Sequence, residues 1–232
     1  MTSVPFNNLK SSDLIVDATY ESDRQTNTVA AEPIGPLTGT GNQGGFRFSG
    51  SITKPEIVVL YKTMDEPDWP DNLDEETGIF QYYGDNRKPG FEIHDRNAGR
   101  GGNQILRNVF KLSHGVVDDR ALVPPFLIFS KSGFRRDVIF RGLAVPGAIH
   151  LNESSDLIAI WKSIAGQRFQ NYKATFTILD MGKINREWLI DIRNNKKSAV
   201  TAPLNTKTGW KQVSQKHYRP KRLALLEHLK NS

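Results

Sequence analysis

Short runs of β-branched and aromatic residues recur along this 232-residue chain, and most of them are separated by glycine, proline, aspartate or asparagine. Runs of this length and composition predict β-strands joined by turns. A sheet of many short strands commonly curls or closes to hide its edges, so the pattern favours a strongly bent sheet or a β-barrel. The predicted strands are Phe46–Ile52, Ile57–Tyr61, Ile79–Tyr83, Phe126–Ser130, Val138–Val145, Leu157–Trp161 and Ala174–Leu179.

Amphipathic segments are fewer, and they predict helices that flank this β-structure. Apolar residues recur at helical spacing in Asn103–Leu112, and similar patterns occupy Asn185–Arg193 and Lys221–Lys230. Residues up to about Pro36 have mixed polarity, and only the short apolar run Leu14–Val16 suggests an edge strand there. The sequence therefore predicts an α+β fold in which helices pack outside a bent sheet or barrel.

Two absences in the composition exclude classes of protein. The chain has no cysteine, which excludes disulfide bonds, thiolate catalysis and cysteine-ligated zinc. It also has no apolar run near the ~18 residues that span a bilayer, and Met1 to Lys10 lack the layout of a secretory signal. We expect a soluble, intracellular protein with no membrane partner.

The positive charge is concentrated near the C-terminus. The formal net charge is +6, yet eight Lys or Arg residues and no acidic residue lie between Lys196 and Arg222. This segment could contact nucleic-acid phosphates, or it could be a solvated linker to a further domain. We therefore divide the chain into a domain at residues 1–195 and a basic segment with a C-terminal helix at residues 196–232.

Motifs of hydrolytic enzymes are missing. Metal-dependent nucleases of the PD-(D/E)xK type need an acid or glutamine two residues before a lysine, and the chain has no such triplet. It has no GxSxG motif either. We expect no catalytic and no metal-ligating residue, because the histidines are far apart and lack ligand spacing: His94, His114, His150, His217 and His228.

The segment Gly39–Gly44 matches the GxGxxG motif, which binds dinucleotides only between a strand and a helix. Here a proline-containing stretch precedes the motif and an alternating, strand-like stretch follows it, so the context argues against a cofactor. The structural alternative is a flexible glycine-rich turn. A further interpretation is a loop that enters a DNA groove, where Asn42 and Gln43 offer paired donors and acceptors to base edges.

An acidic stretch and an aromatic strand together indicate a binding site. Asp65 to Glu76 holds seven acidic residues and Trp69, and the aromatic run Ile79–Tyr83 follows, ending at Gly84 and basic residues. A pocket for a base flipped out of DNA needs flat side chains on both sides and a carboxylate that accepts from the N4 amine of cytosine. The order of residues here meets that requirement.

This order also resembles a known family. An aromatic residue, an aspartate, about ten residues and then Tyr-x-Gly are typical of the SET-and-RING-associated (SRA) methylcytosine-binding domain. Gly41–Arg47, the run Val58–Arg87 and Val123–Phe126 are similar to the N-terminal, SRA-like domains of the modification-dependent restriction endonucleases MspJI, AspBHI and LpnPI. The resemblance covers roughly Thr38–Pro146, and the LpnPI domain is the nearest counterpart that we expect.

The resemblance implies roles for individual residues. It makes Asp71 the carboxylate that reads N4, Tyr82 one stacking wall, and Trp69 or Tyr61 the other, while Tyr83 lines the pocket where SRA domains have a small hydroxyl residue. For Trp69 the alternative is a core residue under the acidic loop. The residues expected to contact DNA are Asn42, Gln43, Arg47, Arg87, Lys131, Arg135 and Arg136. For Arg135 and Arg136 the alternatives are phosphate binding and solubility.

The function implied is recognition of 5-methylcytosine or 5-hydroxymethylcytosine in double-stranded DNA by base flipping. The parent protein would be a cytoplasmic, prokaryotic, homo-oligomeric restriction endonuclease whose Mg²⁺-dependent nuclease domain is missing from this chain. The chain itself would be a monomer without a cofactor. Two alternatives remain open: a non-catalytic β-barrel adaptor that stacks single-stranded bases, and a hydrolase with a carboxylate pair within Asp65 to Glu76.

Overall fold

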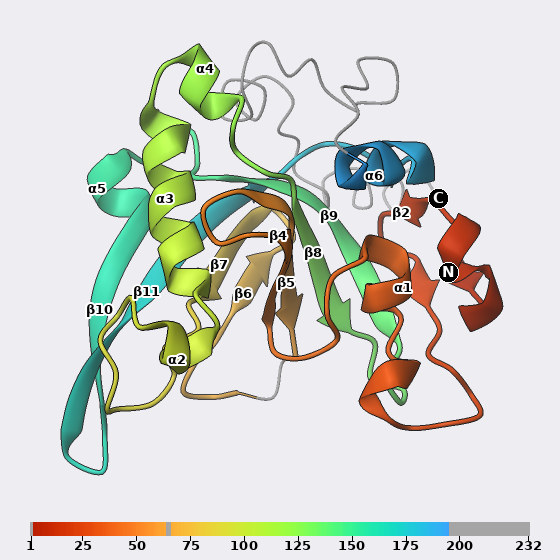
Figure 1. Cartoon of the computed structure of the whole chain (residues 1–232), viewed down its shortest axis with the longest axis horizontal. Coiled ribbons are helices and arrows are strands. Elements are labelled where there is room, and N and C mark those ends of the chain that lie inside the picture. The colour runs from red at the N-terminus through yellow and green to blue at the C-terminus, as the bar shows by residue number, and fades with distance from the viewer. Residues whose placement is uncertain (1, 64–65, 195–232) are drawn as a thin grey trace. The chain divides into compact units, whose positions relative to one another are not determined.

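The computed structural model of the chain describes residues 2–63 and 66–194 (Figure 1). These residues form two compact units. The first consists of residues 2–63, 66–67, 124–143 and 181–194, and the second of Asp68–Val123 and Ala144–Asp180. The described residues within the domain expected at 1–195 thus fall into two units, and the domain boundary itself stays a prediction. The basic segment and the helix predicted at Lys221–Lys230 lie outside the described residues.

A sheet forms the centre of the first unit. Its strands follow the order β4-β5-β8-β9, and β3 and β1 continue it from β9. β4 and β5 are antiparallel, whereas β5 and β8 are parallel. The strands are β1 (Ser3–Val4), β3 (Thr19–Tyr20), β4 (Phe46–Gly50), β5 (Pro55–Lys62), β8 (Phe126–Lys131) and β9 (Val138–Pro146), of which the last three residues belong to the second unit.

Short elements complete the first unit. β2 pairs with β12 in a small separate sheet, and α6 buries Trp188 and Leu189. The core lies around β5, in which Ile57 to Leu60 are all fully buried, the pattern of a strand covered on both faces. The remaining elements are η1 (Phe6–Ser11), β2 (Leu14–Ile15), η2 (Val29–Ala31), α1 (Ile34–Thr38), β12 (Lys183–Ile184) and α6 (Arg186–Arg193).

The second unit is organised around the long strand β11. Its first part pairs with β10, and its second part pairs with β7 and with the end of β9. β6 pairs with the outer side of β7. The elements are β6 (Asn72–Asp74), β7 (Ile79–Tyr83), α2 (Arg96–Gly99), α3 (Gly102–His114), α4 (Val117–Arg120), α5 (Glu153–Asp156), β10 (Leu157–Ile164) and β11 (Gln167–Ile178).

The helix α3 packs on this second sheet. Its apolar side chains Ile105, Leu106, Val109 and Phe110 are buried. The Phe110 ring meets Phe176 of β11 edge-on, with the ring centroids 5.2 Å apart, a favourable aromatic geometry. The helix therefore covers the same face of the sheet that carries the core phenylalanines.

The predicted fold class is confirmed. All seven predicted strands and the helices at Asn103–Leu112 and Asn185–Arg193 are present; most ends differ by at most a few residues, but β11 begins at Gln167, well before the predicted Ala174. The barrel alternative is corrected: among the described strands β4 pairs only with β5 and β6 only with β7, so each unit keeps an open sheet edge. No helix among the described residues is long and apolar enough to cross a membrane.

Candidate functional site

Trp69 and Tyr83 form the centre of an aromatic cluster in the second unit. Side chains alternate along β7, so Phe80 and Tyr82 lie on one face of the strand and Tyr83 on the other. The Trp69 ring lies 5.8 Å from the Tyr83 ring and 6.0 Å from the ring of Phe169 on β11, measured between centroids. Trp69 is only 6% exposed, so its neighbours close the cluster.

A cation covers the indole of Trp69. The Lys162 ammonium of β10 lies 5.1 Å from the Trp69 ring centroid and donates a 2.8 Å hydrogen bond to the backbone oxygen of Asp68. A cation over the face of tryptophan is attracted by the negative face of the ring. Trp69 is thus packed like a core residue, yet it lies directly beside a charged side chain.

The Asp71 carboxylate is fixed to the backbone of β7. Its Oδ1 accepts a 2.7 Å hydrogen bond from the Tyr83 amide, and its Oδ2 lies 3.6 Å from Nη2 of Arg87. Burial, followed by the charge of Asp71, raises the pKa of the Tyr83 hydroxyl. The local structure therefore holds a carboxylate at a defined position beside the Trp69–Tyr83 pair.

Arg87 supports this carboxylate from the turn after β7. Its guanidinium also donates to the backbone oxygens of Gly84 and Tyr83, at 3.3 and 3.4 Å. Burial lowers the pKa of Arg87 from its very high ordinary value, and its side chain remains 25% exposed. Arg87 was expected to contact DNA, and the structure places it where it can also position Asp71.

One expected stacking residue, Tyr82, lies outside this cluster. Tyr82 is fully buried with its ring 6.1 Å from Phe80, on the opposite face of β7. A base could stack on Tyr82 only after neighbouring side chains move. Tyr61 belongs to the first unit, where the guanidinium of Arg47 lies 4.9 Å from its ring centroid. The structure thus brings together Trp69, Asp71 and Tyr83.

The side chain of Asn42 attaches the glycine-rich loop of the first unit to the backbone of the preceding segment. The Asn42 side chain accepts from the Gly35 amide at 2.7 Å and donates to the backbone oxygens of Val29 and Glu32 at 3.2 Å. Asn42 was expected to read bases; in this structure its amide is engaged within the fold, and the expected base contact stays a prediction. Gln43 is exposed beside it.

Arg47 has a similar internal role. Its side chain is 3% exposed and forms an ion pair with Glu32, itself 6% exposed, and it donates a 2.7 Å hydrogen bond to the Gly44 oxygen. Arg47 was expected to contact DNA; its guanidinium is buried in this conformation, and the expected DNA contact stays a prediction. The hydrogen bond to Gly44 links β4 to the glycine-rich loop, whereas the ion pair links β4 to Glu32, just before α1.

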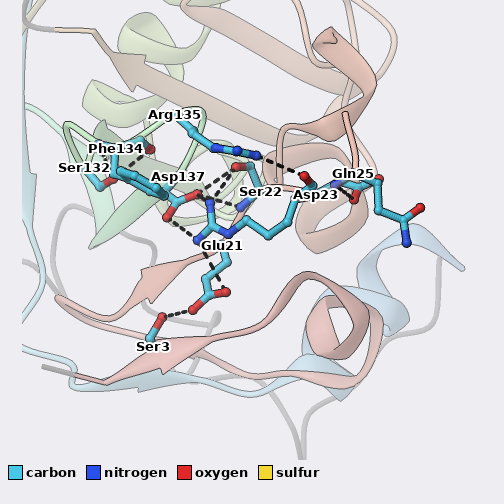
Figure 2. A network of polar contacts seen from close by, with 10 residues as sticks. Ser3, Glu21, Ser22, Asp23, Gln25, Ser132, Phe134, Arg135 and Asp137 are labelled. Carbon is cyan, nitrogen blue, oxygen red and sulfur yellow. Dashed lines mark hydrogen bonds and ion pairs between the residues drawn. The ribbon is translucent and has the colours of Figure 1, made fainter. Parts of the chain in front are cut away.

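The turn that follows β8 is braced against the segment 21–27 (Figure 2). Asp137 accepts two hydrogen bonds from the Arg24 guanidinium, at 2.7 and 2.8 Å, and also bonds the amide and hydroxyl of Ser22. Burial alone would raise the pKa of Asp137, but the hydrogen bonds from Arg24 and Ser22 and the positive charge of Arg24 lower it below its ordinary value. Such a bidentate pair is among the stronger polar contacts.

The tip of the same turn is exposed. Phe134 is 59% exposed, and the guanidinium of Arg24 lies 5.0 Å from its ring centroid. Arg135 and Arg136 each donate a 3.0 Å hydrogen bond to the backbone, at Arg24 and Asn27. These arginines were expected to contact DNA, and each has further donors beyond the one used here. Lys131 is half-buried at the end of β8.

Some residues of this neighbourhood could not be found from the sequence. Lys162 and Phe169 lie about 90 and 100 residues after Trp69, and no motif connects them. Asn103 and Asn171 pack against Gly84, where a Cβ would lie 1.9 Å from Oδ1 of Asn103. That close approach requires glycine after Tyr83. The Tyr-x-Gly pattern was the one signal for it.

Among the described residues, no group of three or more His, Asp or Glu side chains could hold a metal ion. The GxGxxG segment follows α1 and precedes β4, the reverse of the dinucleotide-binding order. Gly39, at a φ of 77°, ends α1, and a Cβ there would lie 2.5 Å from the Arg193 guanidinium.

The sequence matches one family, described as Restriction endonuclease AspBHI N-terminal, over residues 14–223. The DNA recognition domain of the cytosine modification-dependent restriction endonuclease LpnPI is 42% identical, with a TM-score of 0.77 over 84% of this chain and 86% of that one. The DNA modification-dependent restriction endonuclease AspBHI is 44% identical, with a TM-score of 0.83 over 95% of this chain.

A more distant structure, MspJI in complex with a 27-mer oligonucleotide, is 15% identical with a TM-score of 0.63 over 89% of this chain, and it shows a shared fold. The chain spans 55% of the AspBHI chain and 54% of the MspJI chain, or about half of each. No protein with a curated description matches the sequence significantly.

Proposed function

Because the chain belongs to the restriction endonuclease AspBHI N-terminal family, we propose that it binds double-stranded DNA and recognises a cytosine modified at C5 after flipping it out of the helix. The related LpnPI domain recognises DNA and serves a cytosine modification-dependent enzyme. The proposal gives this chain the same class of ligand. It includes 5-methylcytosine and 5-hydroxymethylcytosine, which differ by one small group at C5.

One observation carries the proposal: the carboxylate of Asp71 is fixed beside the Trp69–Tyr83 pair. Flipping a base costs a few kcal/mol of unstacking, and aromatic stacking can return about 1–3 kcal/mol per base. Oδ2 of Asp71 is the acceptor that we assign to the N4 amine of cytosine, since Oδ1 already accepts from the Tyr83 amide. Thymine has an oxygen at this position and would be repelled.

The stacking surfaces require some rearrangement of the cluster. Trp69 and Tyr83 contact each other directly, so a base would enter by separating one ring from its neighbours. Tyr82, fully buried behind β7, remains the second candidate wall and needs a larger movement. We assign Trp69 and Tyr83 first, because their rings lie together and the Asp71 carboxylate is bonded to the backbone of Tyr83.

Contacts to flanking bases and phosphates are assigned to the first unit. Gln43 is exposed on a loop that Asn42 and Arg47 hold in place. Phe134 and Arg135 form the exposed tip of a braced turn (Figure 2). Rigid support of this kind lowers the entropy lost on binding.

The parent protein is proposed to be a modification-dependent restriction endonuclease, as AspBHI is. In that enzyme this chain would supply recognition. A separate nuclease domain would supply cleavage with Mg²⁺, and the enzyme would act as a homo-oligomer. This chain spans about half of the AspBHI chain. The statements about cleavage and assembly therefore rest on family membership and not on residues of this chain.

The test is a binding titration with two duplexes that differ by a single 5-methyl group. The wild-type chain should prefer the methylated duplex. Asp71→Asn should lower that preference at least about tenfold, because hydrogen bonds to charged groups contribute about 1.5–3 kcal/mol. Asparagine can still accept from the Tyr83 amide, so the fold should be preserved.

Glu76→Ala is the matched control, since it removes an exposed carboxylate from the same acidic stretch. It should leave the preference unchanged. Equal affinity of the wild-type chain for both duplexes would refute recognition of the modification, and it would favour the alternative of a general nucleic-acid-binding module. An unchanged preference in Asp71→Asn would refute the role assigned to Asp71 alone.

A further inference from the structure

The hairpin of β10 and β11 forms a ribbon that extends beyond the rest of its unit. The strands pair from Leu157–Ala174 to Ile164–Gln167, and residues 163–168 at the tip are all exposed. Figure 1 shows this end reaching past α2. β10 pairs with no other described strand. Both faces of the ribbon are therefore accessible near its tip.

The ribbon carries only positive charge. Residues 157–178 contain Lys162, Arg168 and Lys173 and no aspartate or glutamate. Register places Lys162 and Lys173 on the face of Phe169 and Tyr83, whereas Arg168 lies on the opposite face, beside Trp161. Cations thus project from both faces of a two-stranded element.

Large apolar side chains are exposed on the same ribbon. Trp161 is 57% exposed, with the guanidinium of Arg168 4.6 Å from its ring centroid. On the other face Ile158 and Ile164 are 42% and 40% exposed. Exposed apolar groups among cations are typical of a surface that meets a partner with both charge and flat or methylated groups.

The ribbon is continuous with the candidate site. Lys162 of β10 bonds the backbone of Asp68 and covers Trp69, and Phe169 of β11 packs on the same indole. All of these residues belong to the second unit. DNA bound at the Trp69–Asp71 cluster would therefore also meet the ribbon.

We propose that the β10–β11 ribbon enters the major groove of the bound duplex. This inference rests on the proposed function. The major groove, about 12 Å wide, admits a two-stranded β-ribbon, and phosphates line both of its walls. The cations on the two faces of the ribbon can each contact the phosphates of the groove wall that they face. Trp161 shares one face with Arg168, and Ile158 and Ile164 share the other with Lys162, so these apolar groups enter the groove with the cations, where thymine methyl groups offer apolar contacts.

Arg168→Ala tests the electrostatic part in the full chain. Each lost phosphate contact lowers the slope of log affinity against log salt by about one. Arg168→Ala should therefore reduce the slope by about one on both the methylated and the unmethylated duplex, with the preference between them unchanged. Arg168→Lys should keep the slope. Lys111→Ala, an exposed lysine on α3, is the control and should also keep it.

The groove is tested with a photocrosslinking residue. p-Benzoylphenylalanine in place of Trp161 should crosslink to the duplex, and methyl green, a major-groove ligand, should block the reaction while netropsin, a minor-groove ligand, should not. An unchanged salt slope in Arg168→Ala, an absence of crosslinks, or a block by netropsin alone would overturn the ribbon proposal. Equal affinity of the wild-type chain for both duplexes would instead refute the proposed function, so the two failures are distinguishable.

Discussion

Asn42 and Gln43 carry the same amide group on adjacent residues, yet the fold uses them differently. Asn42 is a structural residue: its amide bonds three backbone groups, at Gly35, Val29 and Glu32. Gln43 is exposed at the adjacent position. The shorter side chain reaches the neighbouring backbone, and the longer one projects outward. Gln43 is therefore the residue of this pair that we propose to contact a base.

Alanine substitutions should separate these two roles. Asn42→Ala leaves a backbone donor without its acceptor, so it should lower the free energy of unfolding by about 1–3 kcal/mol. Gln43→Ala should change it by less than about 0.5 kcal/mol but alter the preference for bases next to the modified cytosine. Urea unfolding and titration of a duplex library measure the two effects. A stability loss in Gln43→Ala equal to that in Asn42→Ala would contradict this division.

At the scale of elements, the start of α3 depends on one half-buried carboxylate. Asp85 accepts hydrogen bonds from the amides of Gly102 and Asn103, at 2.7 and 3.0 Å. These amides favour the ionised form, yet burial prevails and raises the pKa of Asp85 from 3.8 to about 6. The turn after β7, which carries Arg87, is thereby attached to the helix.

This raised pKa predicts a pH dependence of stability. Between about pH 4 and 6 the folded chain holds a proton on Asp85 that the unfolded chain has lost, so the contribution of Asp85 to stability falls as pH rises. Asp85→Asn does not titrate. The difference in the free energy of unfolding, wild type minus Asp85→Asn, should therefore decrease from pH 4 to pH 7 in urea titrations. An increase would mean that the helix amides outweigh burial.

The local sequence pattern predicted the helices and strands better than it predicted the tertiary contacts between them. The run Ile79–Tyr83 could be recognised as a strand because its aromatic residues alternate with the period of β-structure. The burial of Tyr82 and the placement of Tyr83 beside Trp69 could not, because the sequence does not say which face of a strand meets the helix. Phe169 and Lys162 reach Trp69 only through the pairing of β10, β11 and β7. The short strand β6 was not predicted, because Asn72–Asp74 lies within the acidic stretch and lacks the β-branched and aromatic residues that indicate strands.

For the whole molecule, binding strength and selectivity have separate physical origins. The cations of the β10–β11 ribbon and of the turn at Arg135 face phosphates in the proposed complex, and phosphates are the same in every duplex. Selectivity is assigned to Asp71 and the Trp69–Tyr83 pair, which meet one base. A 5-methyl group adds no charge, so it releases no additional counterions when it is buried.

Salt should therefore weaken binding without changing selectivity. Plots of log affinity against log salt from about 50 to 300 mM should be parallel for the methylated and unmethylated duplexes, with the methylated line displaced upward by a constant amount. Fluorescence anisotropy of labelled duplexes measures both lines under identical conditions. If the base enters the site only when it is modified, base flipping could bring additional phosphates into contact with the protein. The plot of log affinity against log salt would then be steeper for the methylated duplex than for the unmethylated one. Parallel lines would mean that the same number of phosphates is neutralised on both duplexes, so that the cations set the affinity while Asp71 and the Trp69–Tyr83 pair set the preference.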